Sequence, residues 1–572
     1  MSIQTFWFTF FAGKIDAMMS IDNLKRMKGV ILNEVNGFAL GSDKRDDDPE
    51  IVRMQNLYDV QNHNLDFSFD IPAKILYGRM EMEAQSLTDT LNQVYINLLD
   101  NMTVEYVKID GEDVSYERNE EYLIINSKGL IGKFDNFIVS VKYQGKPELQ
   151  GFDSFAIKEF GGYPALYTLS EPTYAPTWWP CKDLPSDKFT VSLNITVPGE
   201  LTAASVGTLE STQDNGDGTK TFSWKSSYPI TTYLVSLAIG KYDTWEEEYT
   251  SLDGTTTMPV VYYSYVPYTN KAKRDWDNTV EMIEYFSGLF GEYPFINEKY
   301  GMAMFGWTSG AMEHQTLSSM GYLTVTGNKM FETVVAHELV HQWFGDAISP
   351  ETWMDLWLNE GFASYGEALW MEHKKGKDAL FSYMQKEDYG FFLGTVYDPE
   401  GFIFGPTVYQ KGSWVLHMLR GVVGDSTFFK ILNTYYEEYK YKTANTEQFR
   451  EVCERVSGMN LEDFFEQWVT IGKGRPVYQY SWSAEKYDGQ EGTDAYTLRL
   501  EVEQVQDEKS NWSIFKMPVE VTVETDMGTE KLIFFNDKRT QQFTHPVSGK
   551  PSKVYLDKDG WILKSTKEVA GK

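Results

Sequence analysis

The sequence predicts a multidomain α+β protein with an all-β domain first, a mainly α-helical domain next and a small β-sandwich last. Its length of 572 residues is too great for one hydrophobic core and suggests roughly three or four domains. A hydrophobic fraction of 42% and an aromatic fraction of 15% are typical of a well-packed globular protein. The spacing of apolar residues changes along the chain from alternating to helical and back, which sets the order of the three domains.

Residues 1–47 are expected to form an extension, because apolar residues recur at helical spacing up to Val35 and a charged linker run then leads to Pro49. The apolar run from Phe6 to Phe11 is too short to span a membrane, and no Lys or Arg precedes it, so it makes a poor signal peptide. A truncated leader would look the same. We therefore expect a soluble protein, either cytoplasmic or exported, whose compartment the sequence does not predict.

Residues 48–243 are predicted to form the all-β domain, because short runs of β-forming residues alternate there with turn signals. The segment 191–197 alternates between apolar and polar residues, as a half-buried strand does. The segment 214–218, with two Asx-Gly pairs, is a hairpin signal.

Residues 244–474 are predicted to form the mainly α-helical domain, with long helical stretches near 407–424 and 446–472. Beyond Pro476 the alternation returns, as in 496–502, and it continues to the end of the chain. This pattern predicts a β-sandwich over residues 475–572.

The charge balance excludes some partners. The chain has 83 acidic and 52 basic residues and a formal net charge of -31, which repels nucleic acid and anionic membranes and favours cationic ligands. Most of these carboxylates are expected simply to form a solvated surface. Cys181 and Cys453, the two cysteines, lie far apart in sequence and predict no disulfide framework. None of these features predicts an oligomeric state.

The most informative segment is His337-Glu338-Leu339-Val340-His341. Two histidines four residues apart on a helix lie on one face, so their imidazoles can bind a single metal ion. Catalytic zinc takes three protein ligands and keeps an open position for water, and Glu360, eighteen residues beyond His341, supplies the missing carboxylate. We therefore expect one Zn²⁺ per chain, bound by His337, His341 and Glu360.

Glu338 is the expected general base. It is one residue from His337, about 100 degrees of helical rotation, so it should flank the metal and reach the hydrolytic water. This combination is typical of peptide hydrolysis. Random placement of seven histidines would produce such a pentapeptide on the order of one time in a hundred.

A second motif, Gly310-Ala311-Met312-Glu313-His314, makes the chain resemble peptidase family M1, the aminopeptidase N-like gluzincin zinc aminopeptidases, whose exopeptidase signature is Gly-Ala-Met-Glu-Asn. The resemblance implies that Glu313 binds the free α-amine of the substrate, while the backbone at Gly310 and Ala311 aligns the peptide. A carboxylate paired with an ammonium is a charge-assisted contact. His314 stands where the family has Asn, and the sequence does not predict its effect.

Two further segments extend the resemblance. Tyr409-Gln410-Lys411-Gly412 is similar to the family's Tyr-Glu-Lys-Gly, which implies that Tyr409 donates a hydrogen bond to the oxyanion of the intermediate. Glu171 lies in a segment that resembles the one where relatives place a second amine-binding carboxylate. Relatives commonly have Gln two positions earlier, where this chain has Leu169.

The resemblance covers residues 50–572 and implies an N-terminal β-saddle domain, a thermolysin-like catalytic domain and a β-sandwich, without the large C-terminal helical domain of longer members. It implies a zinc metallo-aminopeptidase that removes single residues from peptides with a free N-terminus. A thermolysin-like endopeptidase, an epoxide hydrolase-like enzyme and a non-catalytic scaffold with a peptidase fold are the alternatives. The natural substrate and the preferred N-terminal residue are not predicted.

Overall fold

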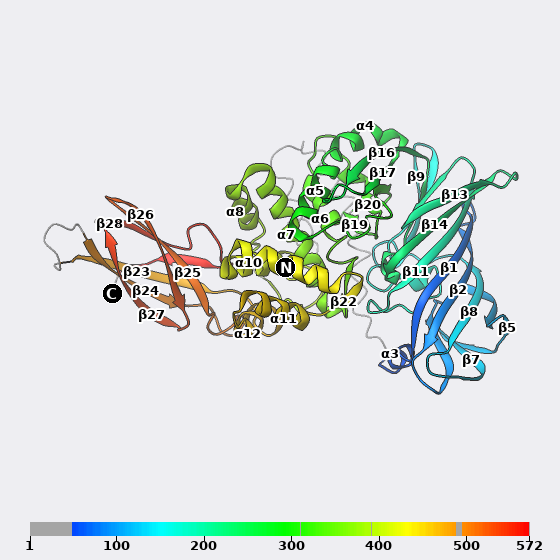
Figure 1. Ribbon diagram of the computed structural model, residues 1–572, viewed down its shortest axis with the longest axis horizontal. Helices are drawn as coiled ribbons and strands as arrows, with labels where there is room; N and C mark the ends of the chain where they lie inside the picture. The colour runs from blue at the N-terminus through cyan, green and yellow to red at the C-terminus, as the bar shows by residue number, and fades with distance from the viewer. Residues whose placement is uncertain (1–48, 309, 391, 488–494, 571–572) are drawn as a thin grey trace. The chain divides into compact units, whose positions relative to one another are not determined.

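The computed structural model of the protein describes residues 49–308, 310–390, 392–487 and 495–570 (Figure 1). The expected N-terminal extension, residues 1–47, lies outside these ranges. The described chain divides into two compact units. The first holds the residues up to Trp353 together with Tyr436–Asn445, and the second holds Met354–Tyr435 and the residues from Thr446 onward.

The first unit begins with a β-rich part built on an eight-stranded sheet of order β13-β14-β11-β1-β2-β8-β4-β5. Strands β1 and β11 pair in parallel, and the other neighbours pair antiparallel. The predicted strand at 191–197 lies within β11, and the predicted hairpin turn joins β13 to β14, so both predictions are confirmed. The strands are β1 (Tyr58–Asp70), β2 (Ile75–Ser86), β4 (Met102–Ile109), β5 (Glu112–Asp113), β8 (Asn136–Gly145), β11 (Phe189–Pro198), β13 (Thr208–Asp214) and β14 (Thr219–Ile230).

Two smaller sheets complete the β-rich part, with orders β12-β15-β10-β9 and β3-β7-β6. Short helices connect or precede the strands. The further elements are α3 (Pro49–Gln55), β3 (Leu91–Asn97), β6 (Tyr116–Arg118), β7 (Tyr122–Ile131), β9 (Phe155–Phe160), β10 (Tyr163–Thr168), η1 (Ala175–Thr177), β12 (Thr202–Ser205), η2 (Thr232–Leu234) and β15 (Leu237–Gly240).

The first unit continues with a five-stranded sheet that the sequence analysis did not anticipate within residues 244–474. Its order is β16-β17-β18-β20-β19. All six residues of β18 are buried, so the strand lacks the alternation that marks a half-exposed one. The elements are β16 (Tyr242–Thr250), β17 (Thr257–Tyr265), η3 (Val266–Tyr268), α4 (Thr269–Asp275), α5 (Thr279–Phe290), β18 (Tyr300–Phe305), β19 (Ala311–Met312), β20 (Ser318–Gly321), η4 (Tyr322–Thr324), α6 (Glu332–Val340), β21 (Ile348–Pro350) and β22 (Lys442–Ala444).

The second unit contains the long helices. The helical stretches predicted near 407–424 and 446–472 are confirmed by α9 and by the run from α11 to the π-helix η6. Every residue of α9 from Gln410 to Arg420 is buried, so this helix forms the centre of its unit. The elements are η5 (Trp353–Asp355, at the junction of the units), α7 (Trp357–Lys375), α8 (Lys377–Lys386), α9 (Gln410–Val423), α10 (Asp425–Tyr439, which also crosses the junction), α11 (Thr446–Ser457), α12 (Glu462–Phe465) and η6 (Glu466–Thr470).

Two sheets follow these helices, with orders β27-β24-β23-β29 and β26-β25-β28. The predicted strand at 496–502 lies within β24 and is confirmed. No helix in the described ranges is long and apolar enough to cross a membrane. The strands are β23 (Val477–Lys486), β24 (Ala495–Gln504), β25 (Met517–Thr525), β26 (Gly528–Asn536), β27 (Thr540–Ser548), β28 (Pro551–Leu556) and β29 (Ser565–Glu568).

Candidate functional site

Helix α6 carries His337 of the metal motif, and His341 is the residue that caps the helix C-terminus. One side of the helix is buried in the protein interior through the apolar residues Val335, Ala336 and Leu339. His337 and His341 lie one turn apart, and their ring centroids are 4.8 Å from each other. The prediction that the two imidazoles lie on the same face is therefore confirmed.

The loop after α6 fixes the ring of His341. Nδ1 of His341 lies 3.1 Å from the backbone carbonyl oxygen of Phe344. A carbonyl oxygen can only accept, so Nδ1 is the protonated nitrogen and Nε2 keeps the lone pair that a metal requires. A backbone carbonyl that orients a histidine in this way is typical of metal sites.

Helix α7 places Glu360 in its first turn, where the carboxylate is almost fully buried. The start of the helix is anchored by two hydrogen bonds from Thr446 to Asp355, at 2.9 and 2.8 Å, and by the indole of Trp357, which donates to Thr446 at 2.9 Å. The hydroxyl of Tyr409, immediately before α9, donates to Oε1 of Glu360 at 2.8 Å. The second unit therefore holds the predicted carboxylate ligand and the predicted oxyanion donor next to each other.

Helices α7 and α9 approach closely at two glycines. A Cβ atom added to Gly361 would lie 2.9 Å from the carbonyl carbon of Gly412, and one added to Gly412 would lie 3.0 Å from Cα of Gly361. Gly361 follows Glu360 directly, and Gly412 lies three residues after Tyr409. Any larger residue at either position would push apart the backbones that carry this hydrogen-bonded pair.

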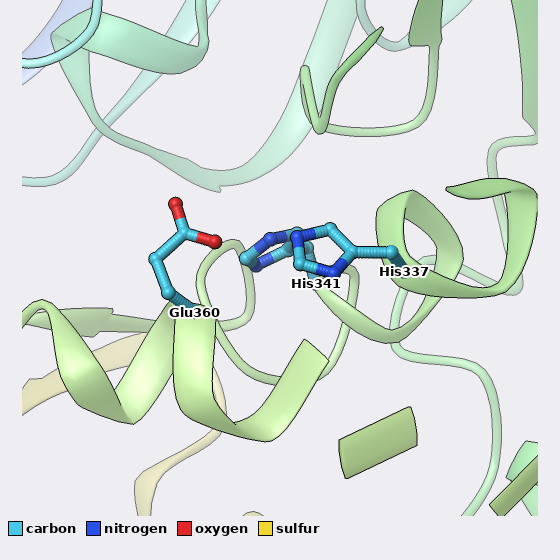
Figure 2. A group of neighbouring side chains, drawn as sticks. All are labelled: His337, His341 and Glu360. Carbon is cyan, nitrogen blue, oxygen red and sulfur yellow. The ribbon is translucent and has the colours of Figure 1, made fainter. Parts of the chain in front are cut away.

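One ligand atom from each of His337, His341 and Glu360 lies within 4.8 Å of the other two, and Figure 2 shows the three side chains directed toward one another. Two imidazoles and one carboxylate are a ligand set of catalytic zinc sites. The tautomer that the Phe344 carbonyl imposes on His341 fits the same purpose. The structure thus brings together the three residues predicted from sequence, and the group could bind a metal ion.

Glu313 and Glu171 gather in the first unit, where one carboxylate oxygen of each lies within 4.8 Å of the other. Both side chains are less than 5% exposed. Two carboxylates this close in a buried place repel each other unless a cation lies nearby. Glu338 is also buried, at 5% exposure, on α6.

Gln342, which the sequence analysis missed, links the Glu313 segment to the residues that follow His341. The amide of Gln342 donates to the carbonyl of Glu313 at 3.1 Å and accepts from the backbone N–H of Thr316 at 2.8 Å. Gln342 is fully buried and directly follows His341, so its position beside the motif is the signal that points to it.

His314, which stands in place of the family's Asn, is fully buried and makes a hydrogen bond of 2.8 Å between Nδ1 and the Ser319 hydroxyl. Burial lowers the pKa of His314 to about 3, so the ring is neutral. The side chain therefore joins the two ends of the turn between β19 and β20. Gly310 and Ala311, the residues predicted to align the peptide, lie at the start of this hairpin, and Ala311 pairs with Met320.

Comparison with known proteins places the chain among peptidases. The model of the peptidase M1 N-terminal domain matches residues 59–234, and the model of the peptidase family M1 domain matches residues 274–468. Probable aminopeptidase 2 of Sulfurisphaera tokodaii is 26% identical over an alignment of 449 residues, with 74% of this chain and 54% of the relative covered. Glutamyl aminopeptidase of Homo sapiens is 29% identical over an alignment of 402 residues, with 65% of this chain and 40% of the relative covered. The chain spans about half the length of the curated relatives it matches.

Comparison with solved structures also finds M1 peptidases. A mutant M1 zinc metallopeptidase of Deinococcus radiodurans bound to a Tyr-Ser-Ala substrate has a TM-score of 0.64 and 26% identity, covering 73% of this chain and 94% of that one. Aminopeptidase A of Legionella pneumophila, bound to aspartic acid, has a TM-score of 0.75 at 17% identity, which concerns the fold alone, and covers 89% of this chain and 60% of that one. The multidomain fold with an N-terminal β-rich domain and a catalytic domain is thus confirmed. Because the two matched family models together span more than half of the sequence, the chain belongs to peptidase family M1.

Proposed function

We propose that the protein is a zinc aminopeptidase that removes single amino acids from the free N-terminus of peptides. The observation that carries this proposal is the group of His337, His341 and Glu360, whose ligand atoms lie within 4.8 Å of one another. The names of the relatives, which include aminopeptidases, support the same activity.

His337, His341 and Glu360 would hold the zinc ion. When bound, zinc would act as a Lewis acid that polarises the scissile carbonyl and activates water as the nucleophile. Glu338 then acts as general base: its buried carboxylate accepts a proton from the attacking water and returns it to the leaving amine. A carboxylate in a poorly hydrated place is well suited to shuttle a proton in both directions.

Tyr409 stabilises the developing negative charge. Its hydroxyl donates to Glu360 at 2.8 Å and is therefore held at the edge of the metal-binding group. A preorganised hydroxyl donor can transfer its hydrogen bond to the substrate oxygen as that oxygen becomes negative, which typically contributes about 10²–10³ in rate.

Glu313 and Glu171 recognise the free N-terminus. Their carboxylate oxygens lie within 4.8 Å of each other in a buried place, so a substrate ammonium would relieve their repulsion and form two charge-assisted contacts. The same contacts place the first peptide bond at the metal, because only one residue separates the ammonium from the scissile carbonyl. This arrangement favours an aminopeptidase over the alternative, a thermolysin-like endopeptidase.

The proposal is tested with a panel of aminoacyl-arylamides, matched N-acetylated peptides and an epoxide substrate, each assayed with and without a chelator. We expect cleavage of substrates with a free amine, loss of cleavage with chelator, and recovery with added zinc. Equal rates on N-acetylated peptides would favour the endopeptidase. Turnover of the epoxide alone would favour the epoxide hydrolase-like activity, and no turnover at all would favour a scaffold.

We also propose the domain assignment made from the sequence: a β-saddle over 48–243, a thermolysin-like catalytic domain over 244–474 and a β-sandwich over 475–572. The β-sandwich is supported by the rings of Phe534 in β26 and Phe543 in β27, which stack at 4.6 Å although the two strands belong to different sheets. Limited proteolysis at low protease concentration tests it, since cuts near residue 475 should release a stable C-terminal fragment.

A further inference from the structure

A lysine from the β-rich part of the first unit supports the loop that follows α6. Lys188 directly precedes β11, and its ammonium donates to the carbonyl oxygens of Asp346 at 2.6 Å and Ala347 at 3.2 Å. A third bond of 3.0 Å reaches the hydroxyl of Ser349. An ammonium has three donors, so these contacts satisfy all of them.

The loop itself is coiled back onto the end of α6. The N–H groups of Asp346 and Ala347 donate to the carbonyls of His341 and Gln342, at 2.9 and 3.1 Å. The last carbonyls at a helix C-terminus have no partner within the helix, and a cation placed beside them is favourable. The loop N–H groups satisfy the carbonyls of His341 and Gln342, and Lys188 bonds the next carbonyls, those of Asp346 and Ala347, from a segment more than 150 residues away in sequence.

A second side chain of the β-rich part holds the neighbouring carbonyl. Tyr233, in η2, is fully buried, and its hydroxyl donates to the carbonyl of Gly345 at 3.1 Å. Lys188 and Tyr233 therefore hold three consecutive carbonyl groups of the loop. These groups directly follow Phe344, whose carbonyl orients His341.

Placing a lysine here costs free energy, because burial disfavours the charged ammonium. Burial lowers the pKa of Lys188 to about 7, and the charge of Asp346 acts in the opposite direction. Asp346 is itself fully buried, and its carboxylate oxygens have no hydrogen-bond partner among the described residues. Burial raises the pKa of Asp346 well above its usual value, and the charge of Lys188 opposes that shift.

We propose that Lys188 is a positioning residue of the metal centre: it holds the loop at Asp346 and Ala347 and thereby keeps the Phe344 carbonyl in place to orient His341. The inference rests on the proposed function, because it requires that His341 binds the metal. Groups that orient a metal-binding histidine typically change metal affinity by about 10-fold to 100-fold when they are removed. Lys188 acts one step further out, so the lower end of that range applies.

The test uses the zinc-loaded full chain and measures the rate at which an excess of a chromogenic chelator removes zinc. We expect Lys188→Met to lose zinc about 10-fold faster than the wild type. The matched control is Lys182→Met. Lys182 is a buried lysine six residues earlier that donates to the Tyr58 carbonyl at 2.8 Å and pairs with Asp187 at 2.9 Å, and neither partner belongs to the loop.

Thermal unfolding of the metal-free proteins is measured in parallel. Both substitutions should lower the melting temperature, but only Lys188→Met should speed zinc release. A wild-type release rate in folded Lys188→Met would overturn the proposal, as would equal acceleration by Lys182→Met. If the wild type takes up no zinc, the proposed function fails and this proposal fails with it, whereas the first two outcomes leave the proposed function intact.

A milder variant covers the case in which Lys188→Met does not fold. Tyr233→Phe removes the hydroxyl that donates to the Gly345 carbonyl and should speed zinc release a few-fold. Its control is Tyr242→Phe, which removes a comparable bond of 2.8 Å from a buried tyrosine to the Met304 carbonyl. Equal release rates in these two variants would contradict the claim that the β-rich part holds the loop.

Discussion

Gly361→Ala should reduce catalysis while it lowers stability only modestly. Gly361 lies within α7 and faces Gly412 of α9, and a Cβ atom at this position would lie 2.9 Å from the Gly412 carbonyl carbon. Neither glycine has a positive φ, so the requirement for glycine here is space. An alanine therefore fits only if the two helices separate.

The size of the effect follows from that contact. Carbon atoms pack at about 3.5–4.0 Å, so the helices must move apart by roughly 0.6 Å or more. Overpacking of this kind costs about 1–3 kcal/mol, while alanine gains about 1 kcal/mol over glycine in helix propensity, so the net loss of stability should be about 0–2 kcal/mol. The same displacement could stretch the 2.8 Å bond between Tyr409 and Glu360 to about 3.4 Å, longer than the usual length of about 2.5–3.0 Å for an O–H···O bond.

Misplacement by this distance can reduce turnover by about 10-fold to 100-fold. The assay compares kcat on an aminoacyl-arylamide, zinc content and melting temperature for Gly361→Ala, Gly412→Ala and a control, Gly288→Ala. In α5 a Cβ atom at Gly288 would meet nothing within 4 Å, so that alanine should leave kcat unchanged and stabilise the protein by up to about 1 kcal/mol. If Gly361→Ala retains zinc, wild-type stability and kcat within twofold, the packing argument is refuted.

Three other predictions address single groups. Glu338→Gln should retain zinc but lose at least about 10² in kcat, because the general base is removed, and near-normal turnover would contradict its role. Tyr409→Phe should lower kcat by about 10²–10³ with little change in zinc content, measured by metal analysis and steady-state kinetics; an unchanged kcat would exclude it as the oxyanion donor. Burial lowers the pKa of His63 from 6.5 to about 3, so the folded state binds fewer protons than the unfolded state between these pH values and loses stability as the pH falls through that window. Between pH 7.5 and pH 5, His63 should lower the free energy of unfolding by about 2 kcal/mol. Urea unfolding at these two pH values should therefore show a loss of stability that is smaller by that amount in His63→Leu than in the wild type. An equal pH effect in both proteins would rule out this assignment.

The proposed metal-binding group could be predicted from the sequence because its geometry is local. A spacing of four residues on a helix places His337 and His341 on one face whatever the rest of the chain does. Glu360 lies close behind them in sequence, at the start of the next helix. Alternation likewise predicts β11 and β24, since each has one face in a core and one in contact with solvent.

The five-stranded sheet could not be predicted in the same way. Its strand β18 is buried on every residue, and a short apolar run of that kind does not differ in pattern from a buried helix. Strands β19 and β20 are two and four residues long, too short for any periodicity to appear. The sheet nevertheless matters for the site, because the hairpin of β19 and β20 carries Glu313 and is closed by the bond between His314 and Ser319.

The contacts that position the site were equally hidden, and for a different reason. Lys188 and Tyr233 bond backbone carbonyl groups, which are the same at every residue, so no sequence pattern can identify the partner, whereas Gln342 is marked only by its position beside the motif. The residue types that perform the chemistry are fixed by the reaction and can be recognised as motifs. The residues that aim them need only reach a carbonyl from a suitable place in the fold. Measurements of zinc release in Lys188 and Tyr233 variants therefore probe a part of the site that comparison of motifs alone would not reach.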